Sequence, residues 1–165
     1  MKPDLGRFVP PGTDAAQEKK WIVTGLACSA GFSLLYFIIR CCSAHNDLFA
    51  TRLDGKRELI EGAVMLDFKD VLGIAFVGFA ALSLAMLGLA AYHYIYHRIG
   101  SRSIYLMRRL PDRLELHRRC LALPAAGIVC CACAGFLLLC IYYWIYIAMT
   151  PEQCLVPGQW QALWR

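Results

Sequence analysis

Charge is what this chain has little of, and it is missing altogether from three long stretches. Only 18% of the 165 residues are Asp, Glu, Lys or Arg, whereas 59% are hydrophobic. A soluble domain averages about 25% charged residues. The charge-free stretches are residues 21–39, 71–92 and 121–150. A membrane-spanning helix needs roughly 20 apolar residues, so each stretch is long enough for one crossing and little sequence remains for a soluble domain.

The missing charges also exclude several functions. Acidic and basic side chains inside membrane helices usually mark ion and proton pathways, and none of the three stretches contains one. The sequence therefore argues against a self-contained ion-coupled transporter or pump. It also lacks a Gly-rich phosphate loop, a Ser/His/Asp set and an acidic metal motif. We therefore predict no enzyme activity, no catalytic residue and no cofactor.

These observations predict an all-α polytopic membrane protein. We expect one helical domain over residues 1–165, with transmembrane helices at about 21–39, 71–95 and 121–149. The first apolar run is too long for the hydrophobic region of a signal peptide, so it is expected to stay as a membrane anchor.

The loop between the first two spans, residues 40–70, contains a turn signal at 53–56. Apolar residues follow the turn: Leu59, Ile60, Ala63, Val64, Leu66 and Phe68. We favour a helical N-terminal extension of the second span for this piece. The alternatives are a segment that lies on the membrane surface and one that packs against the helix bundle.

Lysine and arginine are distributed unevenly around the spans. The tail 1–20 and the segment 98–120 hold eleven of them, whereas the first loop and the C-terminal tail hold six. The positive-inside rule therefore predicts a cytoplasmic N-terminus and an outside C-terminus, in a plasma membrane. The formal net charge of +5 is explained by arginines that flank spans, so the expected partner is the lipid bilayer and not nucleic acid.

The segment 98–120, here called the elbow, has the densest positive charge, with seven arginines against two acidic residues. Leu110 and Pro111 are expected to end one short helix. Asp112 then begins another, and Glu115 stands at the position of a capping box. The pattern predicts a cytoplasmic amphipathic elbow that lies on the membrane and leads directly into the third span.

The string from Arg108 to Pro124, RRLPDRLELHRRCLALP, resembles the segment before a span in ABC-2-type exporter permeases. There, a Leu-Pro pair followed by a basic residue and a Glu leads into the span through another basic residue. The matching string is also similar to arginine-rich strings in small membrane proteins of Gram-positive bacteria that accompany ABC-transporter components. The candidate partner-binding or lipid-binding residues are Arg108, Arg109, Leu110, Pro111, Arg113, Glu115, Arg118 and Arg119.

The resemblance covers only this part of the chain, and three spans are fewer than such a permease has. It implies a half-size permease or an accessory subunit of an exporter, with an ABC ATPase subunit or another membrane subunit docked on the elbow. The alternative is a non-transport membrane scaffold or accessory protein, whose arginines only set topology and bind anionic lipid.

Small residues recur every four positions in two spans. Gly127, Cys131 and Gly135 form such a stripe in the third span, and small side chains let helix backbones approach closely. We expect this stripe to face another helix. A similar stripe in the first span consists of Gly25, Ser29 and Ser33. Two explanations of this stripe are equally favoured: a specific helix–helix contact, and the ordinary abundance of small residues in membrane spans.

Two pairs of residues have side chains that could bind a transition metal: His93 with His97, and His117 with Cys120. No acidic residue is spaced to support them, and arginines crowd the second pair. We therefore interpret the histidines as interfacial residues of an aromatic belt and predict no metal site. The cysteines at 130–133 are interpreted as small apolar packing residues.

Overall fold

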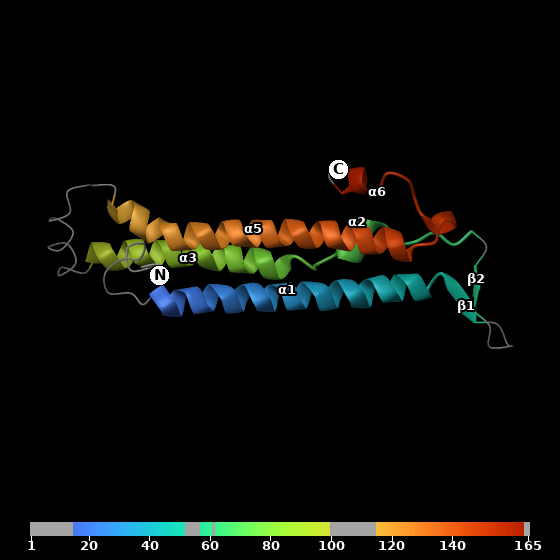
Figure 1. The fold of residues 1–165 in the computed structure, drawn as a ribbon, viewed down its shortest axis with the longest axis horizontal. Helices are drawn as coiled ribbons and strands as arrows, with labels where there is room; N and C mark the ends of the chain where they lie inside the picture. The colour runs from blue at the N-terminus through green and yellow to red at the C-terminus, as the bar shows by residue number, and fades with distance from the viewer. Residues whose placement is uncertain (1–14, 52–56, 61, 100–114, 164–165) are drawn as a thin grey trace, which may run out of the picture. The chain divides into compact units, whose positions relative to one another are not determined.

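A computed structural model of the protein describes residues 15–51, 57–60, 62–99 and 115–163 (Figure 1). In chain order the elements are α1 (Ala15–Asn46), β1 (Phe49–Thr51), β2 (Arg57–Leu59), α2 (Phe68–Leu72), α3 (Val77–Ile99), α5 (Glu115–Met149), the 3-10 helix η2 (Glu152–Cys154) and α6 (Gln159–Ala162). Among the described residues, α1, α3 and α5 are long and apolar enough to cross a membrane. The prediction of a mostly helical chain with three helices able to cross a membrane is thereby confirmed.

The chain divides into two compact units, and α1 and α5 each contribute residues to both. The first unit consists of Met1–Ser29 and Phe79–Cys133, and the second consists of Ala30–Gly78 and Ala134–Arg165. The candidate spans within the long helices are Ala16–Asn46, Val77–Ile95 and Cys120–Met149.

In the first unit, consecutive long helices run antiparallel. Glu18 near the start of α1 contacts His93 near the end of α3, and His93 in turn contacts Cys120 near the start of α5. Close packing follows from a small residue opposite a large one, since Gly25 of α1 lies against the side chain of Leu82 in α3. Such pairing of small and large residues is how membrane helices gain dispersion energy without a hydrophobic driving force.

In the second unit, aromatic rings join the remaining parts of α1 and α5. Phe37 stacks on Tyr142 with ring centroids 4.2 Å apart. The Tyr142 hydroxyl donates to the Ser33 hydroxyl at 3.0 Å, and the Tyr146 hydroxyl donates to the Leu66 carbonyl at 2.9 Å. All three rings are almost completely buried, so the polar tips are satisfied while the ring bodies fill the core.

The end of α1 differs from the prediction. We expected a loop from residue 40, but the helix continues to Asn46. A short antiparallel hairpin follows, in which Phe49 lies opposite Leu59. The predicted turn at 53–56 falls between its two strands, outside the described residues. The purely helical prediction missed this hairpin, whose paired residues Phe49 and Leu59 pack on the buried core.

The predicted helical extension of the second span is wrong. The described residues between β2 and α2 are not helical. This stretch packs against the bundle instead, because Met65 is buried and its amide donates to the Cys154 carbonyl at 3.1 Å. Gln159 then accepts a hydrogen bond from the Phe68 amide at 3.0 Å, so a side chain from the C-terminal tail satisfies the first turn of α2.

The second apolar stretch is also not one continuous helix. It is interrupted after Leu72, and α3 begins at Val77. Gly73 has a φ of 41°, and a Cβ at this position would lie 2.5 Å from the Tyr36 hydroxyl. A positive φ and the closeness of the Tyr36 hydroxyl both require glycine there, and α2 ends at this residue.

Candidate functional site

Most of the elbow lies outside the described residues. This holds for five of its predicted docking positions: Arg108, Arg109, Leu110, Pro111 and Arg113. The other three, Glu115, Arg118 and Arg119, belong to the first turns of α5, where the backbone is described. The docking surface therefore stays a prediction. The C-terminal end of the elbow, however, belongs to the same helix as the third candidate span.

The small-residue stripe of α5 lies partly against other helices. Gly127 is buried, and a Cβ there would be 3.1 Å from the Met86 sulfur and 3.7 Å from Ile22 Cδ1. Cys131, one turn later, is buried at 3% exposure. At Gly135, in the second unit, the nearest atom to a Cβ is Phe76 Cδ1 at 4.0 Å. Close approach is thus tightest at Gly127 and absent at Gly135.

A buried polar cluster lies where the three helices of the first unit meet. Nε2 of His93 is 2.9 Å from Oε1 of Glu18, and their side chains are only 1% and 8% exposed. Oε2 of Glu18 is also buried and has no hydrogen-bond partner in the structure. Buried ionisable groups are expensive in a helix bundle and are usually paired. His93 was predicted to belong to an interfacial aromatic belt, and its burial against Glu18 was not predicted.

The other ring nitrogen of His93 faces a carbonyl that has lost its helical donor. Nδ1 lies 3.5 Å from the carbonyl oxygen of Cys120. In an α-helix this oxygen accepts from the amide four residues later, but that residue is Pro124, which has no N–H. Pro124 and Cys120 are both fully buried. His93 supplies a long hydrogen bond to a group that is otherwise costly to bury.

The signals for this cluster are present in the sequence but were not combined. Glu18 lies seven residues before Gly25, on the same face of α1 as the predicted stripe, whose Ser29 and Ser33 are buried. Likewise, a proline at position 124 marks the carbonyl at 120 as unpaired. The stripe on α1, followed back to Glu18, and the unpaired carbonyl of Cys120 on α5 lie at the same end of the first unit. The sequence does not indicate that His93 on α3 is the residue that contacts both.

The structure does not bring the candidate metal-binding histidines together. His93 faces Glu18, whereas His117 is exposed and its ring stacks on Tyr94 with centroids 5.3 Å apart. The His97 side chain lies outside the described residues. Among the residues that the structure describes, no group of three or more His, Cys, Asp or Glu side chains could hold a metal ion. All nine cysteines are free thiols.

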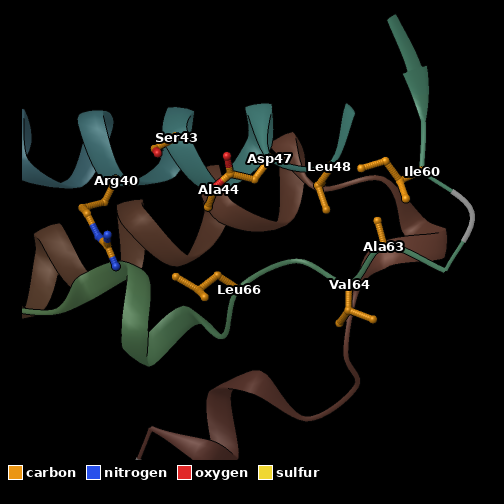
Figure 2. Close-up of a pocket in the computed structure, with 9 residues that line it drawn as sticks. All are labelled: Arg40, Ser43, Ala44, Asp47, Leu48, Ile60, Ala63, Val64 and Leu66. Carbon is orange, nitrogen blue, oxygen red and sulfur yellow. The ribbon is translucent and has the colours of Figure 1, made fainter. Parts of the chain in front are cut away.

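A groove with a volume of about 340 Å³ lies in the second unit. Figure 2 shows its lining residues, which come from the end of α1 and the chain that follows β2. Its lining residues are Arg40, Ser43, Ala44, Asp47, Leu48, Ile60, Ala63, Val64 and Leu66. The Arg40 guanidinium donates to the Asp70 carbonyl at 3.5 Å. The groove offers one cation, one carboxylate and aliphatic walls, with no histidine or cysteine in its lining.

No family model, curated protein or solved structure matches the chain.

Proposed function

We propose that this chain is a membrane-integral subunit or accessory protein of an ABC-2-like exporter. The elbow at 98–120 docks a cytoplasmic partner, an ATPase subunit or another subunit of the exporter. The protein lies in the plasma membrane, with its N-terminus and elbow in the cytoplasm and its C-terminus outside. The proposal joins the elbow string and the positive-inside rule to the helical architecture.

One observation carries the proposal furthest, namely the continuity of α5. This helix runs from Glu115 to Met149 and contains the last residues of the elbow as well as the third candidate span. Binding at Arg118 or Arg119 would therefore act on a helix that also contains the third candidate span. A partner docked on an isolated surface loop has no such connection.

The cluster around His93 adds a second element. It connects the first turns of α5 to α1 and α3 by contacts at Glu18 and Cys120. A displacement of the elbow would therefore be transmitted to all three helices of the first unit. This coupling is the property that an exporter subunit needs at the point where an ATPase acts.

The scaffold hypothesis is favoured by a different observation. Large apolar side chains remain exposed along all three long helices, including Leu35, Leu84, Leu137 and Trp144. These surfaces suit lipid or other membrane proteins equally well. Under this hypothesis the elbow arginines contribute only generic attraction to anionic lipid, on the order of 1 kcal/mol each.

The two hypotheses differ in what arginine is needed for. In docking, the planar guanidinium pairs with specific carboxylates in a geometry that lysine cannot reproduce. The decisive variants are an elbow with all five arginines at 108, 109, 113, 118 and 119 changed to lysine, and a Leu110→Ala/Pro111→Ala elbow. Each is purified gently from its native host, and the co-purified nucleotide-binding subunit is quantified.

Docking predicts loss of the ATPase subunit from both elbow variants. The matched control is Arg57→Lys, an exposed arginine on β2, which should recover the partner fully. Equal recovery from all three variants would remove the docking hypothesis and leave the scaffold.

The topology has its own test. A cysteine introduced at Ser103 should resist an impermeant external reagent in intact cells and react after the cells are opened. Labelling of intact cells at this position contradicts the proposed orientation.

A further inference from the structure

The ring of His93 lies between two oxygen atoms from two other helices. Nε2 is 2.9 Å from Glu18 Oε1, and Nδ1 is 3.5 Å from the Cys120 carbonyl oxygen. A carbonyl oxygen only accepts hydrogen bonds, and an ionised carboxylate does the same. A neutral imidazole carries only one N–H. One more hydrogen is therefore needed to satisfy both contacts at once.

Two arrangements supply that hydrogen. In the first, His93 is an imidazolium that donates to an ionised Glu18 and to the Cys120 carbonyl. In the second, a protonated Glu18 donates to Nε2, while Nδ1–H donates to the carbonyl. Both contain the same number of protons and both are neutral overall. They differ only in whether one proton is bound to Oε1 of Glu18 or to Nε2 of His93, which are 2.9 Å apart.

Losing or gaining a proton disrupts this balance. When one proton leaves for water, the buried pair has a net charge of −1. One of the two contacts of the His93 ring then has no hydrogen, and two lone pairs face each other. When one is added, the pair has a net charge of +1. Either state places uncompensated charge among side chains that are at most 8% exposed, and buried unpaired charge is strongly unfavourable.

We propose that Glu18 and His93 form a proton-binding site that holds one proton between Oε1 and Nε2. Its occupancy determines whether α1, α3 and α5 are held together at Cys120. The proton matters structurally because Pro124 has removed the helical donor from the Cys120 carbonyl. This inference goes beyond partner docking and does not depend on it.

The surroundings of the site contain few other titratable groups among the described side chains. From α1, Lys19 and Lys20 are exposed and Glu18 alone is buried at this level. From α3, the Tyr92 ring lies 6.2 Å from the His93 ring between centroids. From α5, the Cys120 thiol is buried and His117 stacks on Tyr94, whereas the side chains of Glu115, Arg118 and Arg119 lie outside the described residues. None of these replaces the missing proton between His93 and Glu18.

The first test locates the hydrogens directly. The full chain, labelled with ¹⁵N-histidine, is reconstituted in lipid bilayers, and ring nitrogens are observed by solid-state NMR near neutral pH. A His93→Gln variant identifies the His93 signals. The proposal requires a hydrogen on Nδ1 of His93, with Nε2 either protonated or accepting from Glu18. A bare Nδ1 would overturn it.

The second test removes the titratable proton but keeps both contacts. In Glu18→Gln, the amide donates to Nε2 while Nδ1–H still reaches the carbonyl. The heat stability of the wild-type chain should fall as the pH rises and the site releases its proton. The fall should exceed about 2–4 °C in Tm, the shift expected for one lost hydrogen bond in a chain of this size, because loss of the proton also leaves a net charge of −1 buried at the site. Glu18→Gln should lack this component.

The matched control is Glu152→Gln, the same chemical change at an exposed residue of η2. It should keep the wild-type pH profile. A Glu18→Gln profile that follows the wild type over the whole pH range would refute the site. If that variant does not fold, the NMR experiment on the wild-type chain still decides the question.

Discussion

The contact between His93 and the Cys120 carbonyl can be isolated by a double-mutant cycle with Pro124. The structure implies that His93 serves this carbonyl because Pro124 has no N–H. In Pro124→Ala the helix regains its own donor, so the carbonyl no longer needs His93. The substitution His93→Phe removes the histidine donor in either background. Its cost should therefore be smaller when Ala occupies position 124.

The size of the difference follows from the geometry. Leaving a buried carbonyl unpaired costs about 1–3 kcal/mol in soluble proteins. Side-chain hydrogen bonds between membrane helices average about 0.6 kcal/mol and reach about 1.7 kcal/mol. Because the Nδ1–oxygen distance is 3.5 Å, at the long end for a hydrogen bond, we expect a coupling of about 0.5–1.5 kcal/mol. The unpaired Glu18 carboxylate contributes equally in both backgrounds and cancels.

The assay is reversible unfolding of the four variants in mixed detergent micelles, with the free energy of unfolding obtained for each. A control cycle combines Pro124→Ala with Leu82→Ala, whose side chain lies against Gly25; its costs should add within about 0.5 kcal/mol. If the costs of His93→Phe and Pro124→Ala add equally well, the histidine does not serve the carbonyl and the reasoning is refuted.

Three further predictions concern local contacts. Gly73→Ala should lower the free energy of unfolding by more than the roughly 1–2 kcal/mol expected for a positive φ alone, because its Cβ also meets the Tyr36 hydroxyl. Gly62→Ala, where φ is 80° and no atom lies within 4 Å, should incur only the cost of the positive φ. Gln159→Ala should cost about 1–3 kcal/mol in the same assay, since it removes the acceptor for the first amide of α2; no loss contradicts this role. Gly127→Leu should reduce folded protein recovered after solubilisation, while Gly88→Leu, with no atom within 4 Å of its Cβ, should not.

The candidate spans could be predicted because bilayer insertion depends on local properties. A run without charge and of sufficient length satisfies the hydrocarbon core wherever the rest of the chain lies. Residues 21–39 and 121–149 therefore lie within helices that are long and apolar enough to cross a membrane. The expected continuity through 71–95 failed at Gly73, which has a positive φ and lies against Tyr36, 37 positions earlier in the chain.

The polar cluster shows a different limit. Pro124 and Glu18 are both visible in the sequence, but they lie in different helices and neither indicates the other. Glu18 and His93 are 75 residues apart, and no periodicity within one helix connects them. Their pairing arises only from the antiparallel arrangement of α1 and α3.

The sequence by itself determined that this protein has three helices able to span a membrane, because apolar length and the exclusion of charge act residue by residue along one helix. It also supplied the basic elbow string on which the proposed function rests. The tertiary structure alone decided that α1 runs past Arg40 and that a hairpin and the C-terminal tail pack within the second unit. It alone also decided that Glu18, His93 and Cys120 meet. Those outcomes depend on which side chains from distant segments satisfy each other's hydrogen bonds and fill each other's gaps. A one-dimensional pattern of hydropathy does not encode that information.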